Sequence, residues 1–163
     1  PYGAGIPKLC TAFKKPRDEV NSIIRRYARV CPNIAGFNKA QMNRVKSKGY
    51  ITTAFGRILS IFKDEAYKAS NYQNQGYAAG TFKRGQNNID SDLKKVWNYE
   101  IRRILPVHDE IIIEYPRYVL NDYPAVLHDI NWCMINIPEI KTPLMTEWKI
   151  AKTCWQDAEE IQI

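Results

Sequence analysis

Hydrophobic positions in the first third of the chain predict two helices and then a hairpin. Apolar residues recur at helical spacing from Val20 to Cys31, behind a proline and acids suited to a first turn, so a helix is predicted from Pro16 that ends at Pro32. A second helical stretch runs from residue 34 to residue 48, and Gly49 is placed to stop it. β-Branched and aromatic residues then fill positions 49–62 around Gly56, which predicts a β-hairpin.

The middle of the chain has a weaker helical pattern. Residues 64–83 have a helix-compatible composition, although Gly76 and Gly80 each lower helix stability by about 1 kcal/mol relative to alanine. Glycine at these positions permits close approach of a ligand or another backbone segment. The polar run over residues 85–92 predicts a loop or a helix start, and residues 93–99 continue as helix.

A second hairpin is predicted near residues 104–115. Two apolar arms, residues 104–107 and 111–113, flank the polar triplet His108, Asp109 and Glu110, so the pattern indicates strand, tight turn and strand with the acids at the tip. Residues 119–134 are then typical of a helix, and residues 144–150 of a terminal strand. The mixture of helices and antiparallel strands predicts an α+β fold.

Composition supports a folded domain and leaves its partner open. A hydrophobic content of 45%, with 12% aromatic residues, is too high for a disordered tail. The net charge of +7 favours a polyanionic partner such as nucleic acid, but ordinary solubility charge explains it equally well.

The cysteines and the apolar runs indicate neither a metal cluster nor a membrane protein. The four cysteines (Cys10, Cys31, Cys133 and Cys154) form no C-x-x-C pair and have no histidine nearby, so reduced thiols are expected instead of a zinc site or a disulfide framework. No apolar run has the length of a membrane span, and the N-terminus lacks a secretory signal pattern. An intracellular location is expected.

The acids of the second hairpin are candidates for a metal site. Carboxylates held by two rigid apolar strands can bind Mg²⁺, which prefers oxygen ligands, and Asp109 is the expected direct ligand. The alternative is a plain polar turn.

Two amides and several cations are candidates for nucleic-acid contacts. Asn71 and Gln75 stand one helical turn apart, so both side chains can project toward a minor groove of DNA. There they could donate hydrogen bonds to acceptors that are common to every base pair. The alternative is that they belong to a solvated helix face. Four cations are candidates for phosphate contact or plain surface charge: Arg57, Lys68, Lys83 and Arg84.

Four segments together resemble the family A DNA polymerases. VHDE at residues 107–110 is similar to motif C of that family, and NYQNQGYAAG at residues 71–80 is similar to its N-x-x-x-Q-G-x-A-A segment. GYITTAFGR at residues 49–57 resembles G-x-x-x-T-x-x-G-R, and Tyr2-Gly3 resembles the end of the fingers helix that covers the incoming nucleotide. The four matches occur in family order and cover nearly the whole chain.

The resemblance implies a domain organisation and a role for each matched residue. Residues 1–48 would be a helical remnant of the fingers, and residues 49–163 the C-terminal part of the palm with its antiparallel sheet. Asp109 would join an aspartate of motif A in holding two Mg²⁺ ions, with Glu110 as a nearby, less essential acid. His108 would contact the primer terminus or support the turn. Tyr2 and Gly3 would lie beside the incoming nucleotide; the alternative for Tyr2 is a frayed terminal residue. The residues implied in contacts with the template-primer are Asn71, Gln75, Arg57 and Lys68.

Departures from the family pattern define what else is expected. No motif A aspartate segment is found, so the chain is expected to need an N-terminal polymerase portion or a separate polymerase chain and to be inactive alone. Tyr67, followed by Lys68, stands where the family usually has arginine. Such differences are typical of a divergent member, for example a viral one. The expected location is the cytoplasm or nucleoid, or the host cytoplasm if the protein is viral.

Three functions are compared. The first is part of a DNA-directed DNA polymerase that acts on template-primer and dNTP. The second is a non-catalytic DNA-binding or assembly module with a polymerase-like fold. The third is a part of a single-subunit RNA polymerase, which the Asn71 to Ala79 segment and Glu110 disfavour.

Overall fold

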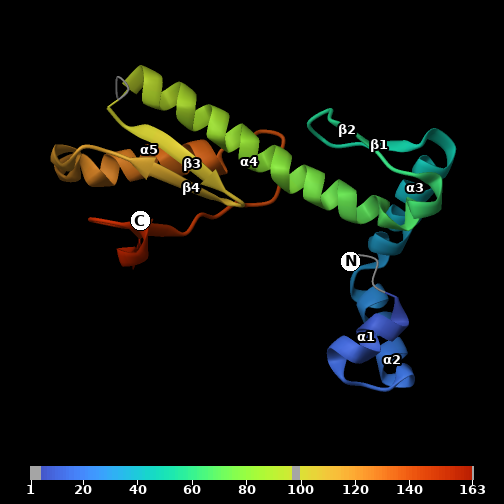
Figure 1. Cartoon of the computed structure of the whole chain (residues 1–163). Helices are drawn as coiled ribbons and strands as arrows, with labels where there is room; N and C mark the ends of the chain where they lie inside the picture. Colours follow the sequence, from blue (N-terminus) through green and yellow to red (C-terminus); the bar gives the residue numbers. More distant parts are fainter. Residues whose placement is uncertain (1–4, 97–99, 163) are drawn as a thin grey trace. The chain divides into compact units, whose positions relative to one another are not determined.

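In the described part of the chain, helices and three two-stranded antiparallel sheets make up the α+β fold that the sequence predicted (Figure 1). The computed structural model describes residues 5–96 and 100–162. Contacts divide the chain into two units, Pro1–Ala78 and Ala79–Ile163, and the division falls within the long helix α4 (Ala69–Val96). Each unit has its own hydrophobic core. The predicted division after residue 48 into fingers and palm parts stays a prediction.

The first unit is mostly helical. In chain order its elements before α4 are α1 (Ile6–Phe13), α2 (Arg17–Val30), α3 (Pro32–Lys48), β1 (Tyr50–Thr52), β2 (Ile58–Ser60) and the 3₁₀ helix η1 (Lys63–Lys68). The predicted helices α2 and α3 and the hairpin are therefore confirmed, whereas α1 was not predicted. Proline at position 32 both prevents α2 from continuing and occupies the first turn of α3, where its missing N–H costs nothing.

The β1–β2 hairpin is closed by a short loop that needs glycine. Thr53 N donates to Arg57 O at 2.9 Å, and Gly56 N donates to Thr53 O at 3.0 Å. Gly56 has a φ of 78°, in the left-handed region that costs other residues free energy. The loop thus resembles a turn followed by a left-handed glycine, a common three-residue hairpin connection.

The hairpin packs on both a core cluster and helix α4. The core cluster on which it packs consists of buried residues of this unit: Val45, Ile51, Ile61, Ala66 and Ala69. On α4, a Cβ at Gly76 would lie 2.8 Å from both Leu59 Cδ1 and Thr53 Cγ2. Glycine at position 76 therefore permits the close approach that the sequence indicated, and the neighbours are side chains of the hairpin.

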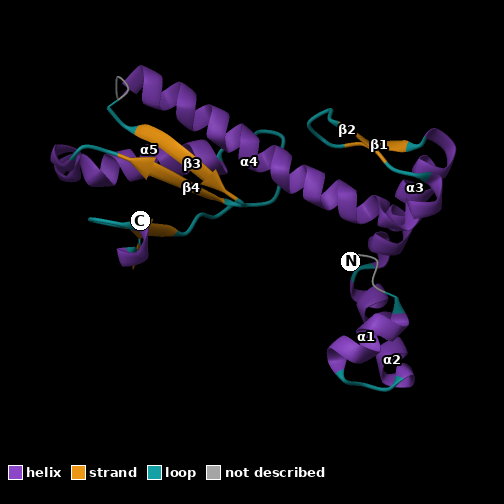
Figure 2. Cartoon of the chain, viewed as in Figure 1, coloured by secondary structure: helices purple, strands orange, loops and turns teal. Residues whose placement is uncertain are grey.

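The second unit contains the rest of α4, a hairpin, a second helix and a further pair of strands (Figure 2). After the remainder of α4 come β3 (Arg102–Val107), β4 (Glu110–Glu114), η2 (Arg117–Asp122), α5 (Tyr123–Ile135), β5 (Trp148–Ile150), η3 (Trp155–Asp157) and β6 (Glu159–Ile161). The core cluster consists of Ile89, Ile101, Val119, Val126, Ile130 and Cys133. No helix among the described residues is long and apolar enough to cross a membrane.

The predicted loop or helix start at residues 85–92 is wrong, because these residues lie inside α4. Their small and polar character serves helix packing. A Cβ at Gly85 would lie 2.6 Å from Met134 Sδ on α5, and Asn88 Nδ2 donates to Cys133 O at 3.1 Å. The predicted terminal strand at residues 144–150 is confirmed only for its last part, Trp148–Ile150, which pairs with β6.

Cys133 is a buried thiol held in its neutral form. Burial, followed by its hydrogen bond to Asp92 and the charges of Asp92 and Asp129, raises the pKa of the thiol from 9.0 to about 12. Its Sγ lies 3.0 Å from Asp92 Oδ2. Cys154, by contrast, is exposed. The thiolate is the reactive species of cysteine, so the two residues should differ in reactivity.

We expect a maleimide at pH 8 to label Cys154 in the native chain and Cys133 only after denaturation, as read by peptide mass spectrometry.

The Cys133 thiol should also make stability depend on pH. Between about pH 9 and 12 the unfolded thiol loses a proton that the folded one keeps, so the free energy of unfolding should fall as pH rises through that window. Cys133→Ala should remove that component of the pH dependence. Native labelling of Cys133 at a rate similar to that of Cys154 would contradict the burial.

Candidate functional site

The β3–β4 hairpin turns through only two residues. Val107 on β3 pairs with Glu110 on β4, which leaves His108 and Asp109 as the loop. His108 has a φ of 55°, the left-handed conformation that a two-residue hairpin turn demands of its first residue. The predicted strand–turn–strand is confirmed, with the refinement that Glu110 is the first residue of β4.

The strands below this turn are fixed to the core of their unit. Ile111 and Ile113 on β4 pack against the buried cluster that α4 and α5 contribute to. At the base of β3, the guanidinium of Arg103 donates two hydrogen bonds to Asp90 of α4, at 2.8 Å and 2.7 Å. The register shifts between Arg103 and Leu105, a bulge that increases local twist. The two strands that hold the turn are therefore anchored, β4 by the hydrophobic core and β3 by the Arg103–Asp90 ion pair.

All three polar residues of the turn region, His108, Asp109 and Glu110, are exposed. Exposed carboxylates on a fixed frame are suitable ligands for a hard cation such as Mg²⁺, which commonly takes one or two protein carboxylates together with substrate phosphates. Within residues 5–96 and 100–162, no group of three or more His, Cys, Asp or Glu side chains is arranged to hold a metal ion. The role of the turn in binding a metal ion therefore stays a prediction.

The predicted DNA-contacting amides lie in the first unit, near the start of α4. Asn71 and Gln75 are one helical turn apart, as predicted, and Gln75 is exposed. Asn71 is half-buried, and its Oδ1 is buried without a hydrogen-bond partner in the described part of the chain. A polar atom left in this state carries a free-energy cost unless a ligand or water satisfies it.

The predicted cations differ in how they are held. The exposed Arg57 follows the β1–β2 loop, and its backbone N–H donates to Thr53 Oγ1 at 3.2 Å. Lys68 is paired with Glu65, and this hydrogen bond raises the pKa of Lys68. Its ammonium also lies 5.7 Å from the ring centroid of Tyr67. A phosphate would have to compete with Glu65 for Lys68, so Arg57 is the better placed of the two.

Other predicted residues are placed as follows. Arg84 forms an ion pair with Glu139 at 2.7 Å, whereas Lys83 is exposed on α4. Tyr2 and Gly3 lie outside the described residues, and their predicted nucleotide contacts stay predictions. The structure thus brings His108, Asp109 and Glu110 together in one unit and places Arg57, Lys68, Asn71 and Gln75 in the other.

A cavity in the first unit was not predicted. It has a volume of about 400 Å³ and lies where α3, the end of β1 with the loop after it, and α4 meet. Phe37, Gln73 and Tyr77 are among the residues that line it. These residues come from elements far apart in sequence, so only the aromatic character of positions 37 and 77 offered a signal.

Comparison with known proteins agrees with the motif pattern. The family model described as DNA polymerase family A matches residues 1–157. DNA polymerase I of Rhizobium leguminosarum is 26% identical over 171 aligned positions, which cover 96% of this chain and 16% of the relative. The thermostable DNA polymerase I of Thermus aquaticus is 25% identical, over 98% of this chain and 20% of the relative.

A solved structure shares the fold. The POL domain of Pol1 from M. smegmatis, in complex with DNA primer-template and dNTP, aligns with a TM-score of 0.72 at 21% identity, over 83% of this chain and 25% of that one. This chain therefore spans about a fifth or less of the length of the bacterial relatives named above. Because the family model covers nearly all of its residues, the chain belongs to DNA polymerase family A.

Proposed function

We propose that this chain supplies the C-terminal part of a DNA-directed DNA polymerase and contributes a metal-binding aspartate and template-primer contacts to nucleotidyl transfer. The observation that carries the proposal is the two-residue turn of the β3–β4 hairpin, which presents Asp109 to solvent on strands anchored in a core. Family membership supports it, as does the polymerase domain from M. smegmatis with a similar fold, which was solved with primer-template and dNTP.

Asp109 would hold Mg²⁺, with the neighbouring carboxylate of Glu110 adding negative charge to the same site. When bound, two such ions would activate the attacking 3′ oxygen and neutralise charge on the leaving pyrophosphate. One aspartate supplies too few ligand oxygens for two ions, so a companion carboxylate from a portion that carries motif A would complete the site. The backbone of the hairpin keeps Asp109 in place for this pairing because β4 packs on the core.

The first unit would contact the template-primer. Asn71 and Gln75 share a helix face and would donate to the N3 and O2 acceptors of the minor groove, which are common to all base pairs. Arg57 would meet a backbone phosphate, and such contacts hold DNA in register without reading its sequence. Tyr2 and Gly3 would lie next to the incoming nucleotide, and His108 next to the primer terminus.

A reconstitution tests the proposal. The chain is mixed with a separately produced N-terminal portion of a related family A polymerase that contains motif A, and primer extension is followed on a labelled template-primer with Mg²⁺. We expect extension with dNTPs in the mixture and in neither part alone. Extension with ribonucleotides only would instead favour an RNA polymerase, and no extension under any pairing that forms a stable complex would count against the catalytic role.

The non-catalytic alternative rests on one observation, the concentration of positive charge in the first unit, which suits DNA binding with or without catalysis. No Asp or Glu occurs in residues 20–63, whereas nine cations do: Arg25, Arg26, Arg29, Lys39, Arg44, Lys46, Lys48, Arg57 and Lys63. A module that only binds DNA would use these cations, and its affinity for DNA would not change when Asp109 is replaced. Both functions require an affinity for DNA that falls as salt rises.

A further inference from the structure

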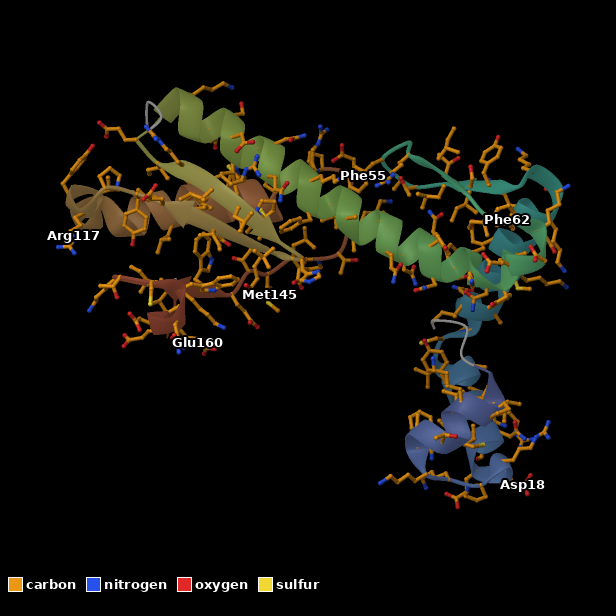
Figure 3. The ribbon with its side chains drawn as sticks, in the orientation of Figure 1. Asp18, Phe55, Phe62, Arg117, Met145 and Glu160 are labelled. Atoms are coloured by element: carbon orange, nitrogen blue, oxygen red, sulfur yellow. The ribbon has the colours of Figure 1, made fainter. Side chains whose placement is uncertain are left out.

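The cavity of the first unit has walls suited to a flat, uncharged ligand. Phe37 enters from α3 and Tyr77 from α4, so two aromatic rings from different elements line one space. Tyr77 is itself supported by the ring of Phe55, whose centroid lies 5.7 Å away at a tilt of 46° (Figure 3 labels Phe55). No side chain that lines the cavity carries a formal charge at neutral pH. Stacking on aromatic faces is the common way for proteins to hold single bases.

A polar group in the wall adds a possible hydrogen bond. Gln73 Nε2 donates to Thr52 O at 3.2 Å, which fixes the amide against β1. Gln73 Oε1 is buried and has no hydrogen-bond partner among the described residues. Leaving such an acceptor unpaired is costly, so rotation of the amide toward a donor such as the exocyclic amino group of a base would be favourable. The cavity therefore combines stacking surfaces with an unused acceptor.

The surroundings of the cavity favour a polyanion. The cavity residues from positions 37 to 54 lie within the acid-free segment described above. Arg57 is joined to Thr53 of the cavity wall by two hydrogen bonds, from Thr53 N to Arg57 O at 2.9 Å and from Arg57 N to Thr53 Oγ1 at 3.2 Å. An uncharged pocket next to an exposed arginine matches a nucleotide unit, whose base is neutral and whose phosphate is negative.

We propose that this cavity binds one unpaired base of the single-stranded template strand, with the base against Phe37 and Tyr77 and its phosphate at Arg57. The base must be unpaired because a base in a duplex is stacked on both faces and paired along one edge, and cannot enter a protein cavity without being flipped out. The inference rests on the proposed function and adds to it a place for the template strand outside the duplex.

The test measures binding of the full chain to a blunt duplex and to a primer-template with a 5′ overhang, by fluorescence anisotropy. An abasic site is moved along the overhang, one position at a time, and 2-aminopurine at the same positions reports stacking by loss of fluorescence. Phe37→Leu removes the ring but keeps an apolar side chain. Phe13→Leu is the matched control, because Phe13 is exposed to a similar extent (49% against 41% for Phe37) on α1, outside the cavity.

We expect one abasic position to weaken binding by about tenfold, which corresponds to one lost base–aromatic stack, and the same position to quench 2-aminopurine. Phe37→Leu should weaken binding of the intact overhang by a similar factor and abolish the dependence on that position, whereas Phe13→Leu should not. If the affinity for primer-template is the same at every abasic position and is unchanged in Phe37→Leu, this inference is overturned and the polymerase assignment stays intact. Failure to bind any DNA, alone or in the reconstituted complex, would overturn both.

Discussion

Asp109→Ala is expected to lower primer extension by the reconstituted polymerase by about 1,000-fold, because loss of a metal ligand removes several kcal/mol of transition-state stabilisation. Binding of template-primer should stay close to that of the unchanged chain, since the proposed duplex contacts Asn71, Gln75 and Arg57 lie outside the β3–β4 hairpin. Single-turnover extension and anisotropy titration on the same complexes separate the two effects.

The control for Asp109 is its neighbour. Glu110→Gln removes a charge at the next position of the hairpin and keeps the shape of the side chain, so a much smaller loss of extension is expected from a residue that is not a direct ligand. Alanine at position 109 should not strain the turn, because the left-handed φ is at His108. Normal extension by the Asp109→Ala complex would refute the assignment, and equal losses in both variants would indicate a general charge effect.

Ile89→Ala is expected to lower the free energy of unfolding of the second unit by about 2–5 kcal/mol, the usual cost of truncating a buried isoleucine. Ile89 is 1% exposed and belongs to the cluster on which Ile111 and Ile113 of the hairpin pack. The stability of a typical domain is about 5–15 kcal/mol, so the loss is a large part of the total. Urea unfolding followed by circular dichroism gives the change in midpoint.

The matched variant at this position is Ile89→Val, which deletes one methylene and should cost about 0.5–1.5 kcal/mol. Because the cluster supports the strands below the turn, Ile89→Ala should also weaken extension in the reconstituted complex more than Ile89→Val does. Equal and negligible losses for the two variants would mean that Ile89 is not packed as the structure shows.

Elements specified by nearby residues could be predicted from the sequence. Helix α2 has acids in its first turn. Helix α3 is followed by Gly49, whose φ of 78° is the left-handed conformation that favours glycine. The hairpin at residues 102–114 follows from two apolar arms around a polar turn. In each case the residues that decide the structure are within a few positions of one another, so the pattern contains enough information.

Elements decided by distant residues were predicted less well. Residues 85–92 contain glycine, asparagine and aspartate, which favour a loop locally, yet they are helical because Gly85 and Asn88 contact α5. Packing of this kind overrides weak local propensity. Helix α1 has only eight residues and no acid in its first turn, so it lacked the signals that identified α2.

The sequence by itself determined helices α2 and α3, the two hairpins around Gly56 and Asp109 and, through four motifs in order, the family to which the chain belongs. Only the tertiary structure decided how firmly the Asp109 turn is supported, that Lys68 is paired with Glu65, and that Phe37 and Tyr77 line one cavity. The physical reason is that motifs record the types of residue at fixed separations along the chain. Burial, ion pairing and cavities depend instead on which distant residues are brought together when the chain folds.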